Sequence, residues 1–248
     1  MRHRFWAATL VAAVALGCAP SLEDAPPRNT LVVGIDVSGS FRRSYDDAID
    51  FAAHYIYGRL NGLGNLRAPT ALFVTGVGGR SPGEMKPFHP IHDFQNKSVE
   101  EIAADLREWF PVQDQFTDFN PFFDRTASLI KRNNLVLAPL NIVLLSDGLP
   151  DTPAEPGDTL GPYQAIVMEP LEYLSRSTTV RLLYPSPTIA VRWERAVDRR
   201  RVRLWTQDAQ VMDGWRAQLL PDQLPEAQHD LWKWIEDNVD FRVRSRIL

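Results

Sequence analysis

An unbroken apolar run, Leu31 to Ile35, is the clearest hydrophobic signal in the chain, and polar residues follow it at once. A run of about five aliphatic residues is typical of a strand that is buried on both faces of a parallel sheet. Asp36, Ser38 and Ser40 come directly after the run, spaced by two along a loop. Because ligands of open α/β sheets bind outside the carboxyl ends of the strands, we expect these three side chains to line such a crevice.

A second apolar run, Ile142 to Leu145, is followed by Asp147, which again places a carboxylate at the end of a strand. Between the two runs we expect Asn120 to cap a helix and Pro121 to occupy its first position. Thr117 then falls in the loop just before that helix, where its hydroxyl can join the same cluster. Hard oxygen donors on short loops suit Mg²⁺ or Mn²⁺ better than zinc.

With these residues the chain resembles the von Willebrand factor type A (VWA) domain from roughly Asn29 to Val239. The resemblance implies a three-layer α/β fold, with a doubly wound, mostly parallel sheet and helices on both faces. It also implies a metal-ion-dependent adhesion site that binds Mg²⁺ or Mn²⁺, directly or through water, and whose octahedron an acidic group of a partner protein can complete. The metal ligands that the resemblance implies are Asp36, Ser38, Ser40, Thr117 and Asp147.

The remaining pattern alternates strands with amphipathic helices, which independently indicates a parallel sheet that is covered on both faces. Helices are predicted from Ser44 to Asn61, from the Ser98 capping box to Pro111, from Asn120 to Arg132, around Ile189–Val197 and around Leu231–Val239. Strands are predicted at Ala71–Val77, Ile142–Leu145, Thr178–Tyr184 and Val202–Trp205, with a short edge strand within Arg80–Lys97. Trp232 lies off the apolar face of the last helix, so we expect it at the rim or exposed.

The N-terminus is predicted to be a targeting segment rather than part of the fold. Two arginines near the start precede an apolar stretch, Phe5 to Leu16, of the length of a signal-peptide core. The following Cys18 ends a sequence that looks like a bacterial lipobox, in which the cysteine receives lipid; the alternative is a buried N-terminal helix with a chance cysteine. We therefore expect a lipoprotein signal peptide at residues 1–17, a lipidated cysteine and flexible tether at 18–29, and a VWA-like domain at 30–248.

Cysteine content and charge limit the compartment and the partners. Cys18 is the only cysteine, so no intramolecular disulfide can form. The net charge of −4 gives no electrostatic case for nucleic acid binding. Ala19 after the cysteine resembles an outer-membrane address in Gram-negative lipoproteins. We expect a monomer of the bacterial cell envelope that is anchored outside the cytoplasm through lipid at Cys18, on the outer membrane if the host is Gram-negative.

These features favour a divalent-cation-dependent protein-binding module for adhesion or assembly, rather than an enzyme. One alternative is a metal-assisted hydrolase, for which Asp118, His89 or His92 would have to act as general base. The other is a structural VWA domain whose metal site is unused. His89, His92 and Asp93 could also be read as zinc ligands, although no cysteine or further histidine lies nearby to complete a tetrahedral set.

Three segments stay open at this point. Arg195 and Arg199–Arg203 form a basic cluster that we interpret as a helix end and a solvated loop, the alternative being contact with anionic lipid or an acidic partner. The proline-rich, acidic loop Leu149–Pro162 either shapes the choice of partner or is a solvated loop. The arginine-rich tail Phe241–Leu248 either pairs as an edge strand or extends away from the domain.

Overall fold

The computed structural model describes residues 29–79, 84, 86–113, 116–151, 161–175 and 177–241. The predicted signal peptide, Cys18 and the tether before Asn29 therefore lie outside the described residues. The same holds for residues 152–160 of the acidic loop and for the tail from residue 242 onward. Within the described ranges, no helix is long and apolar enough to cross a membrane.

In the described part of the chain, six strands form one sheet in the order β3-β2-β1-β4-β5-β6. The strands are β1 (Thr30–Asp36), β2 (Ala71–Val77), β3 (His89–Pro90), β4 (Leu140–Leu145), β5 (Thr178–Leu183) and β6 (Arg203–Gln207). All neighbours pair in parallel except β2 and β3, which are antiparallel. Every residue of β1 is buried, which confirms that the Leu31–Ile35 run forms a strand covered on both faces.

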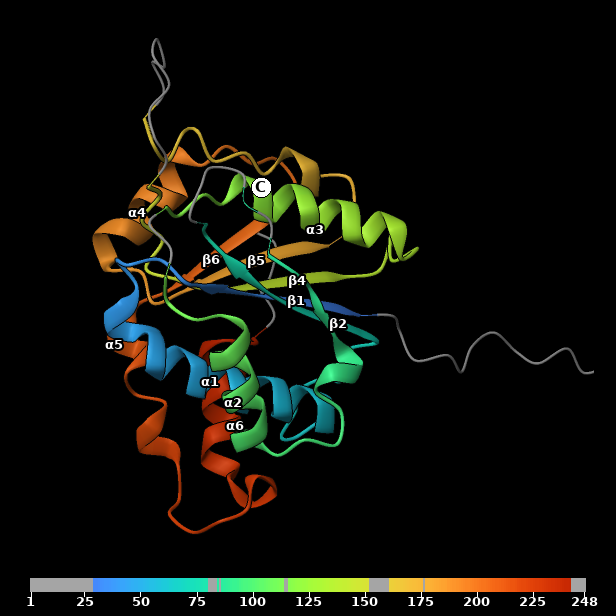
Figure 1. The fold of residues 1–248 in the computed structure, drawn as a ribbon, viewed down its shortest axis with the longest axis vertical. Helices are drawn as coiled ribbons and strands as arrows, with labels where there is room; N and C mark the ends of the chain where they lie inside the picture. The colour runs from blue at the N-terminus through green and yellow to red at the C-terminus, as the bar shows by residue number, and fades with distance from the viewer. Residues whose placement is uncertain are drawn as a thin grey trace, which may run out of the picture.

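Helices cover both faces of this sheet, and Figure 1 shows it nearly edge-on, with α3 and α4 on one side and α1, α2 and α6 on the other. The α-helices are α1 (Arg42–Asn61), α2 (Val99–Trp109), α3 (Asn120–Arg132), α4 (Pro187–Ala196), α5 (Ala209–Met212) and α6 (His229–Asn238). Short 3-10 turns lie at Ile91–Asp93, Glu169–Leu171, Arg216–Gln218 and Pro225–Ala227. The predicted three-layer α/β class with a mostly parallel sheet is thereby confirmed.

The core consists of two clusters, one on each face of the sheet. Successive strand residues point to opposite faces, so Leu31, Val33 and Ile35 contact the α1 layer whereas Val32 contacts the α3 layer. Among the described residues, each face of the sheet is therefore packed against its own helical layer.

Local sequence signals explain where several helices begin and end. Ser98 and Glu101 form the predicted capping box at the start of α2, with the backbone N–H of Glu101 donating to Ser98 Oγ over 3.2 Å. Helix α1 ends at Gly62, whose φ of 62° is the left-handed conformation that glycine adopts without strain. The same helix begins at Arg42, two residues before the predicted Ser44, because Phe41 is its N-cap.

Asn120 does not cap α3, contrary to the prediction. It is the first residue of the helix, and its backbone N–H donates to Asp118 Oδ1 over 3.0 Å. The Asn120 side chain instead bonds the loop before β5, donating to the carbonyl of Ala165 and accepting from the N–H of Val167. The N-cap position is Phe119, whose side chain cannot accept a hydrogen bond, and the Asp118 carboxylate one residue earlier serves the first turn instead.

Trp232 is buried, with 1% of its surface exposed, and does not lie at the rim. Its ring fits against Gly58 of α1, where an added Cβ would lie 2.6 Å from Trp232 Cζ3. Its indole N–H donates to the carbonyl of Pro225 over 2.7 Å. A glycine on a neighbouring helix thus creates the space for this side chain, which the periodicity of α6 alone does not reveal.

Candidate metal centre

The carboxyl ends of β1 and β4 bring Asp36 and Asp147 to the same edge of the sheet. The two strands are direct neighbours, with Ile35 paired to Leu145. Asp36 is fully buried at the end of β1, and its carboxylate is close enough to Asp147 for their charges to interact. Two carboxylates that the sequence places more than a hundred positions apart therefore share one small region.

Hydrogen bonds hold the Asp36 carboxylate in place. Its Oδ1 accepts the backbone N–H of Ser38 over 2.9 Å, and its Oδ2 accepts the hydroxyl of Ser146 over 2.5 Å. Ser146 is itself oriented by the N–H of Gly148, which donates to its Oγ over 2.9 Å. Sequence reasoning did not single out Ser146 as a site residue, although a serine directly after a buried strand was a signal for it.

The hydroxyls of Ser38 and Ser40 connect this carboxylate to Asp147. Their Oγ atoms lie 3.1 Å apart, and the Ser40 hydroxyl hydrogen-bonds the Asp147 side chain. Asp147 Oδ1 also accepts the backbone N–H of Leu149 over 3.0 Å. The structure thus joins four of the five predicted ligands in one polar cluster.

Burial raises the pKa of both carboxyl groups. The pKa of Asp36 rises to about 6 because burial penalises the charge, although the hydrogen bonds from Ser146 and Ser38 oppose the rise. Burial likewise raises the pKa of Asp147, against the hydrogen bonds from Leu149 and Ser40. A nearby cation would favour the ionised form of each.

Thr117, the fifth predicted ligand, lies in a short extended segment at the same edge of the sheet. It pairs with Asp151 in the loop after β4, while its neighbour Phe116 pairs with Gly79 after β2. Only 1% of Thr117 is exposed, and its Oγ1 has no hydrogen-bond partner among the described residues. Buried hydroxyls without a partner are rare in folded proteins, because the lost hydration is not replaced.

Gly148 allows the chain to turn directly after Asp147. Its φ is 72°, and an added Cβ would lie 2.7 Å from Leu182 Cδ2 and 2.8 Å from Trp193 Nε1. Its carbonyl accepts the indole N–H of Trp193 over 2.7 Å. Glycine is therefore required here both for the backbone conformation and for the packing of α4 on the sheet.

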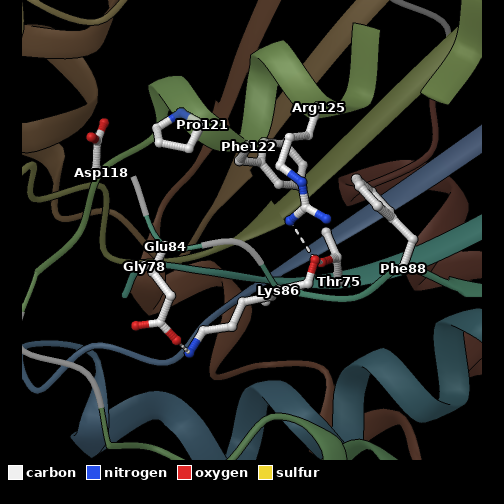
Figure 2. Close-up of a pocket in the computed structure, with 10 residues that line it drawn as sticks. Thr75, Gly78, Glu84, Lys86, Phe88, Asp118, Pro121, Phe122 and Arg125 are labelled. Atoms are coloured by element: carbon white, nitrogen blue, oxygen red, sulfur yellow. Dashed lines mark hydrogen bonds and ion pairs between the residues drawn. The ribbon is translucent and has the colours of Figure 1, made fainter. Parts of the chain in front are cut away.

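A shallow hollow adjoins this cluster between the end of β2 and the start of α3, and Figure 2 shows its lining. Asp118 lies on its rim, and burial raises the pKa of this carboxyl. Lys86 forms an ion pair with Glu84 over 3.0 Å, and Arg125 donates to the carbonyl of Lys86. Asp118 is the residue that a hydrolase would use as general base, and its carboxylate accepts the backbone N–H of Asn120 at the start of α3.

The candidate histidines lie away from this edge. His89 belongs to β3, which pairs with the middle of β2, and its ring stacks on Trp109 with centroids 3.8 Å apart. Its Nδ1 lies 3.2 Å from Asp93 Oδ2. Across the described ranges, no group of three or more His, Cys, Asp or Glu side chains could hold a metal ion. The predicted magnesium site is of a different kind, because two carboxylates and three hydroxyls make it up.

Neither a protein-family model nor a curated protein matches this chain. Among solved structures it is similar to the SpRpn10 VWA domain, with 12% identity, a TM-score of 0.43 and coverage of 81% of this chain and 93% of that one. It is also similar to the manganese-loaded TRAP protein of Plasmodium vivax, with 13% identity, a TM-score of 0.43 and coverage of 74% of this chain and 70% of that one. The pilus adhesin SpaC of Lactobacillus rhamnosus GG has 16% identity and a TM-score of 0.36, with coverage of 50% of this chain and 15% of SpaC. The strand order and the helical layers establish the fold class without these similarities.

Proposed function

We propose that the protein is a VWA-type binding module that holds Mg²⁺ or Mn²⁺ and presents it to an acidic group of a protein partner. The proposed ligands are Asp36, Ser38, Ser40, Thr117 and Asp147. The observation that carries this proposal is the buried Thr117 hydroxyl, which has no hydrogen-bond partner among the described residues and lies at the edge where the other four side chains cluster. A metal ion would give that oxygen a partner.

The chemistry of the donor set fits a hard divalent cation. Asp36 and Asp147 supply two negative charges, and the three hydroxyls supply neutral oxygens of the kind that Mg²⁺ accepts. When bound, the cation supplies a concentrated positive charge that attracts a carboxylate of a partner. The residues of this chain would position the cation, and the surrounding loops would select the partner.

We also propose that Cys18 carries lipid and anchors the protein outside the cytoplasm, in the cell envelope of a bacterium. This proposal rests on the sequence before Asn29, which lies outside the described residues. Several acyl chains together hold a protein stably on a membrane, whereas one chain binds only marginally. Mass spectrometry of the protein extracted from membranes tests it, since lipidation adds the mass of the acyl chains to a peptide that begins at Cys18.

Replacing Thr117 with valine tests the metal site, because valine keeps the shape of threonine but lacks the oxygen. We expect Mg²⁺ and Mn²⁺ affinity to fall at least about tenfold. The metal-free protein should become no less stable, because an unpaired buried hydroxyl costs about 1–3 kcal/mol. Isothermal titration into the metal-stripped protein and thermal melts in EDTA measure the two effects.

Thr126→Val is the matched control for this experiment. Thr126 is also buried with an unpartnered hydroxyl among the described residues, but it lies within α3 rather than in the loops of the site. We expect unchanged metal affinity in this variant. Wild-type metal affinity in Thr117→Val would remove Thr117 from the ligand set and leave the proposal without its main support.

Metal affinity should depend on pH because the proton and the metal compete for Asp36. Burial raises the pKa of this carboxyl to about 6, so below that value Mg²⁺ must displace a bound proton. We expect affinity to be nearly constant above pH 7 and to fall as the pH drops through 6. Titrations in buffers of different ionisation enthalpy, compared at pH 5.5 and 7.5, count the released protons; equal affinity at both values would contradict the assignment of Asp36 as a ligand.

A further inference from the structure

Three loops meet at the amino ends of the parallel strands, on the opposite edge of the sheet from the proposed metal site. The loop before β4 joins the loop before β5 through the N–H of Leu137, which donates to the carbonyl of Leu174 over 2.8 Å. The loop before β6 joins them through Glu172, whose carboxylate accepts the backbone N–H groups of Arg200 and Arg201. The three segments therefore present one continuous surface.

Large apolar side chains project from this surface. Leu137 and Tyr173 are each 67% exposed, and Val136 is 40% exposed. Leu137 also has a φ of 76°, a left-handed conformation that is strained for a residue with a branched side chain. A single exposed leucine needs no explanation, but a strained leucine beside an exposed tyrosine and valine indicates a surface that is covered by something apolar.

Positive charge surrounds these apolar side chains. Lys131 and Arg132 end α3, Arg200 and Arg201 lie in the loop before β6, and all four are exposed. The Arg201 guanidinium lies over the Tyr173 ring, 5.8 Å from its centroid. In the described parts of these loops the exposed acids are Glu169 and Asp198, whereas Glu172 is buried. A protein with a net charge of −4 thus carries a basic, apolar edge.

The domain begins at this same edge. The N–H of Thr30 donates to the carbonyl of Pro139 over 2.9 Å, and Asn29 accepts a hydrogen bond from Asn141. In Figure 1 the start of β1 and the end of α3 lie on the same side of the molecule. The segment 18–29 spans at most about 40 Å when fully extended. A lipid at Cys18 would therefore hold this edge close to the membrane.

We propose that this edge lies against an anionic lipid surface, with the apolar side chains in the interfacial layer and the cations among the headgroups. We call it the basic edge, and it consists of Lys131, Val136, Leu137, Tyr173, Arg132, Arg200 and Arg201. The orientation rests on the proposed lipid anchor, and it directs the proposed metal site away from the membrane. A lipid surface explains the proposed tether at this edge, the exposed apolar side chains and the cations together. A soluble acidic partner explains the cations alone.

The test is vesicle flotation of residues 19–248, which retain the complete described core and lack any lipid. We expect binding to vesicles of phosphatidylcholine mixed with phosphatidylglycerol, weaker binding at high salt, and none to phosphatidylcholine alone. Arg132→Gln and Arg201→Gln should each weaken binding about fivefold. Leu137→Gly should weaken it at least about tenfold and should raise the melting temperature, because glycine relieves the strained φ.

Two controls match the apolar and the charged variants. Leu224→Ser removes a leucine that is 73% exposed on the α6 side, and Arg43→Gln removes an exposed cation at the opposite end of the domain. Neither should change vesicle binding. Equal binding to neutral vesicles, wild-type binding in Leu137→Gly, or binding to the soluble polyanion heparin but to no vesicle would overturn the proposal.

The outcome can be separated from those of the proposed function. Magnesium titration of the same variants reports on the metal site, which the basic edge does not touch. Mass spectrometry of the membrane-extracted protein reports on Cys18. Vesicle binding without metal affinity would support membrane binding by the basic edge and reject the metal-dependent module. Metal affinity without vesicle binding would support the metal-dependent module and reject membrane binding by the basic edge.

Discussion

Asp36→Asn is expected to abolish Mg²⁺ binding and, in EDTA at pH 7, to make the protein more stable. Asparagine keeps an oxygen that can accept the N–H of Ser38, but it lacks the charge that a divalent cation needs. Loss of a carboxylate ligand should reduce affinity by more than about 100-fold. The expected stability gain follows from burial, which raises the pKa of Asp36 from 3.8 to about 6. The net rise, after the hydrogen bonds have opposed it, corresponds to a cost of about 3 kcal/mol for the ionised carboxylate at pH 7.

The pH dependence of the stability gain shows whether it comes from removing the buried Asp36 charge or from a change in packing. The folded state of the metal-free protein holds the Asp36 proton more tightly than the unfolded state, so this group's contribution to stability is greatest below pH 4 and is lost as the pH rises to 6. The stability gain of Asp36→Asn should therefore be near zero at pH 4 and full at pH 7. Thermal melts in EDTA across this range measure it.

Asp147→Asn is the matched variant, because its carboxyl is less deeply buried than that of Asp36. It should lose metal binding as well, with a smaller gain in stability. A large loss of stability in Asp36→Asn would show that the charge is needed for the bond from Ser146. Retained magnesium affinity in both variants would remove the metal from the proposed function.

Asp240→Ala is expected to lower the free energy of unfolding by about 3–5 kcal/mol. The Asp240 carboxylate pairs with Arg59 over 2.5 Å and accepts the Tyr55 hydroxyl over 3.2 Å. Arg59 is only 2% exposed, and its Nε already has no partner among the described residues. Removing the carboxylate would leave a buried guanidinium without a counter-charge, at the point where the end of α6 meets α1.

A second substitution distinguishes loss of the ion pair from loss of the helix end. Arg59→Met in the Asp240→Ala background removes the unpaired charge while keeping the aliphatic stem, so it should restore most of the lost stability. Urea unfolding monitored by circular dichroism gives the values. Asp237→Ala serves as control, since the pair between Asp237 and Lys233 is exposed and should contribute nothing measurable. A double variant no more stable than Asp240→Ala would assign the effect to backbone disruption instead.

Patterns within a few residues predicted much of the fold. The Leu31–Ile35 run became a central buried strand because continuous burial on both faces requires continuous apolar sequence. Ser98 and Glu101 cap α2 because both bonds of a capping box lie within one helical turn. The end of α1 at Gly62 likewise follows from a local backbone preference.

The candidate site was predictable only in its residue types. The sequence placed a carboxylate after each of two strands, and parallel neighbours then bring Asp36 and Asp147 to one edge. That β1 and β4 are neighbours is a property of the sheet order, to which distant segments contribute. The bond from Ser146 to Asp36 and the burial of the Thr117 hydroxyl depend on the same long-range packing.

The helices and strands of this protein and the oxygen-rich character of its predicted site follow from local sequence, because helix caps and hydrophobic periodicity act over a few residues. The burial of Trp232 against Gly58 and the bond from Asn120 to the loop before β5 arise from the tertiary fold. The tertiary fold also gathers Leu137, Tyr173 and Arg201 on one edge. These contacts join residues that are distant in the chain, and close packing in three dimensions selects them rather than any local pattern.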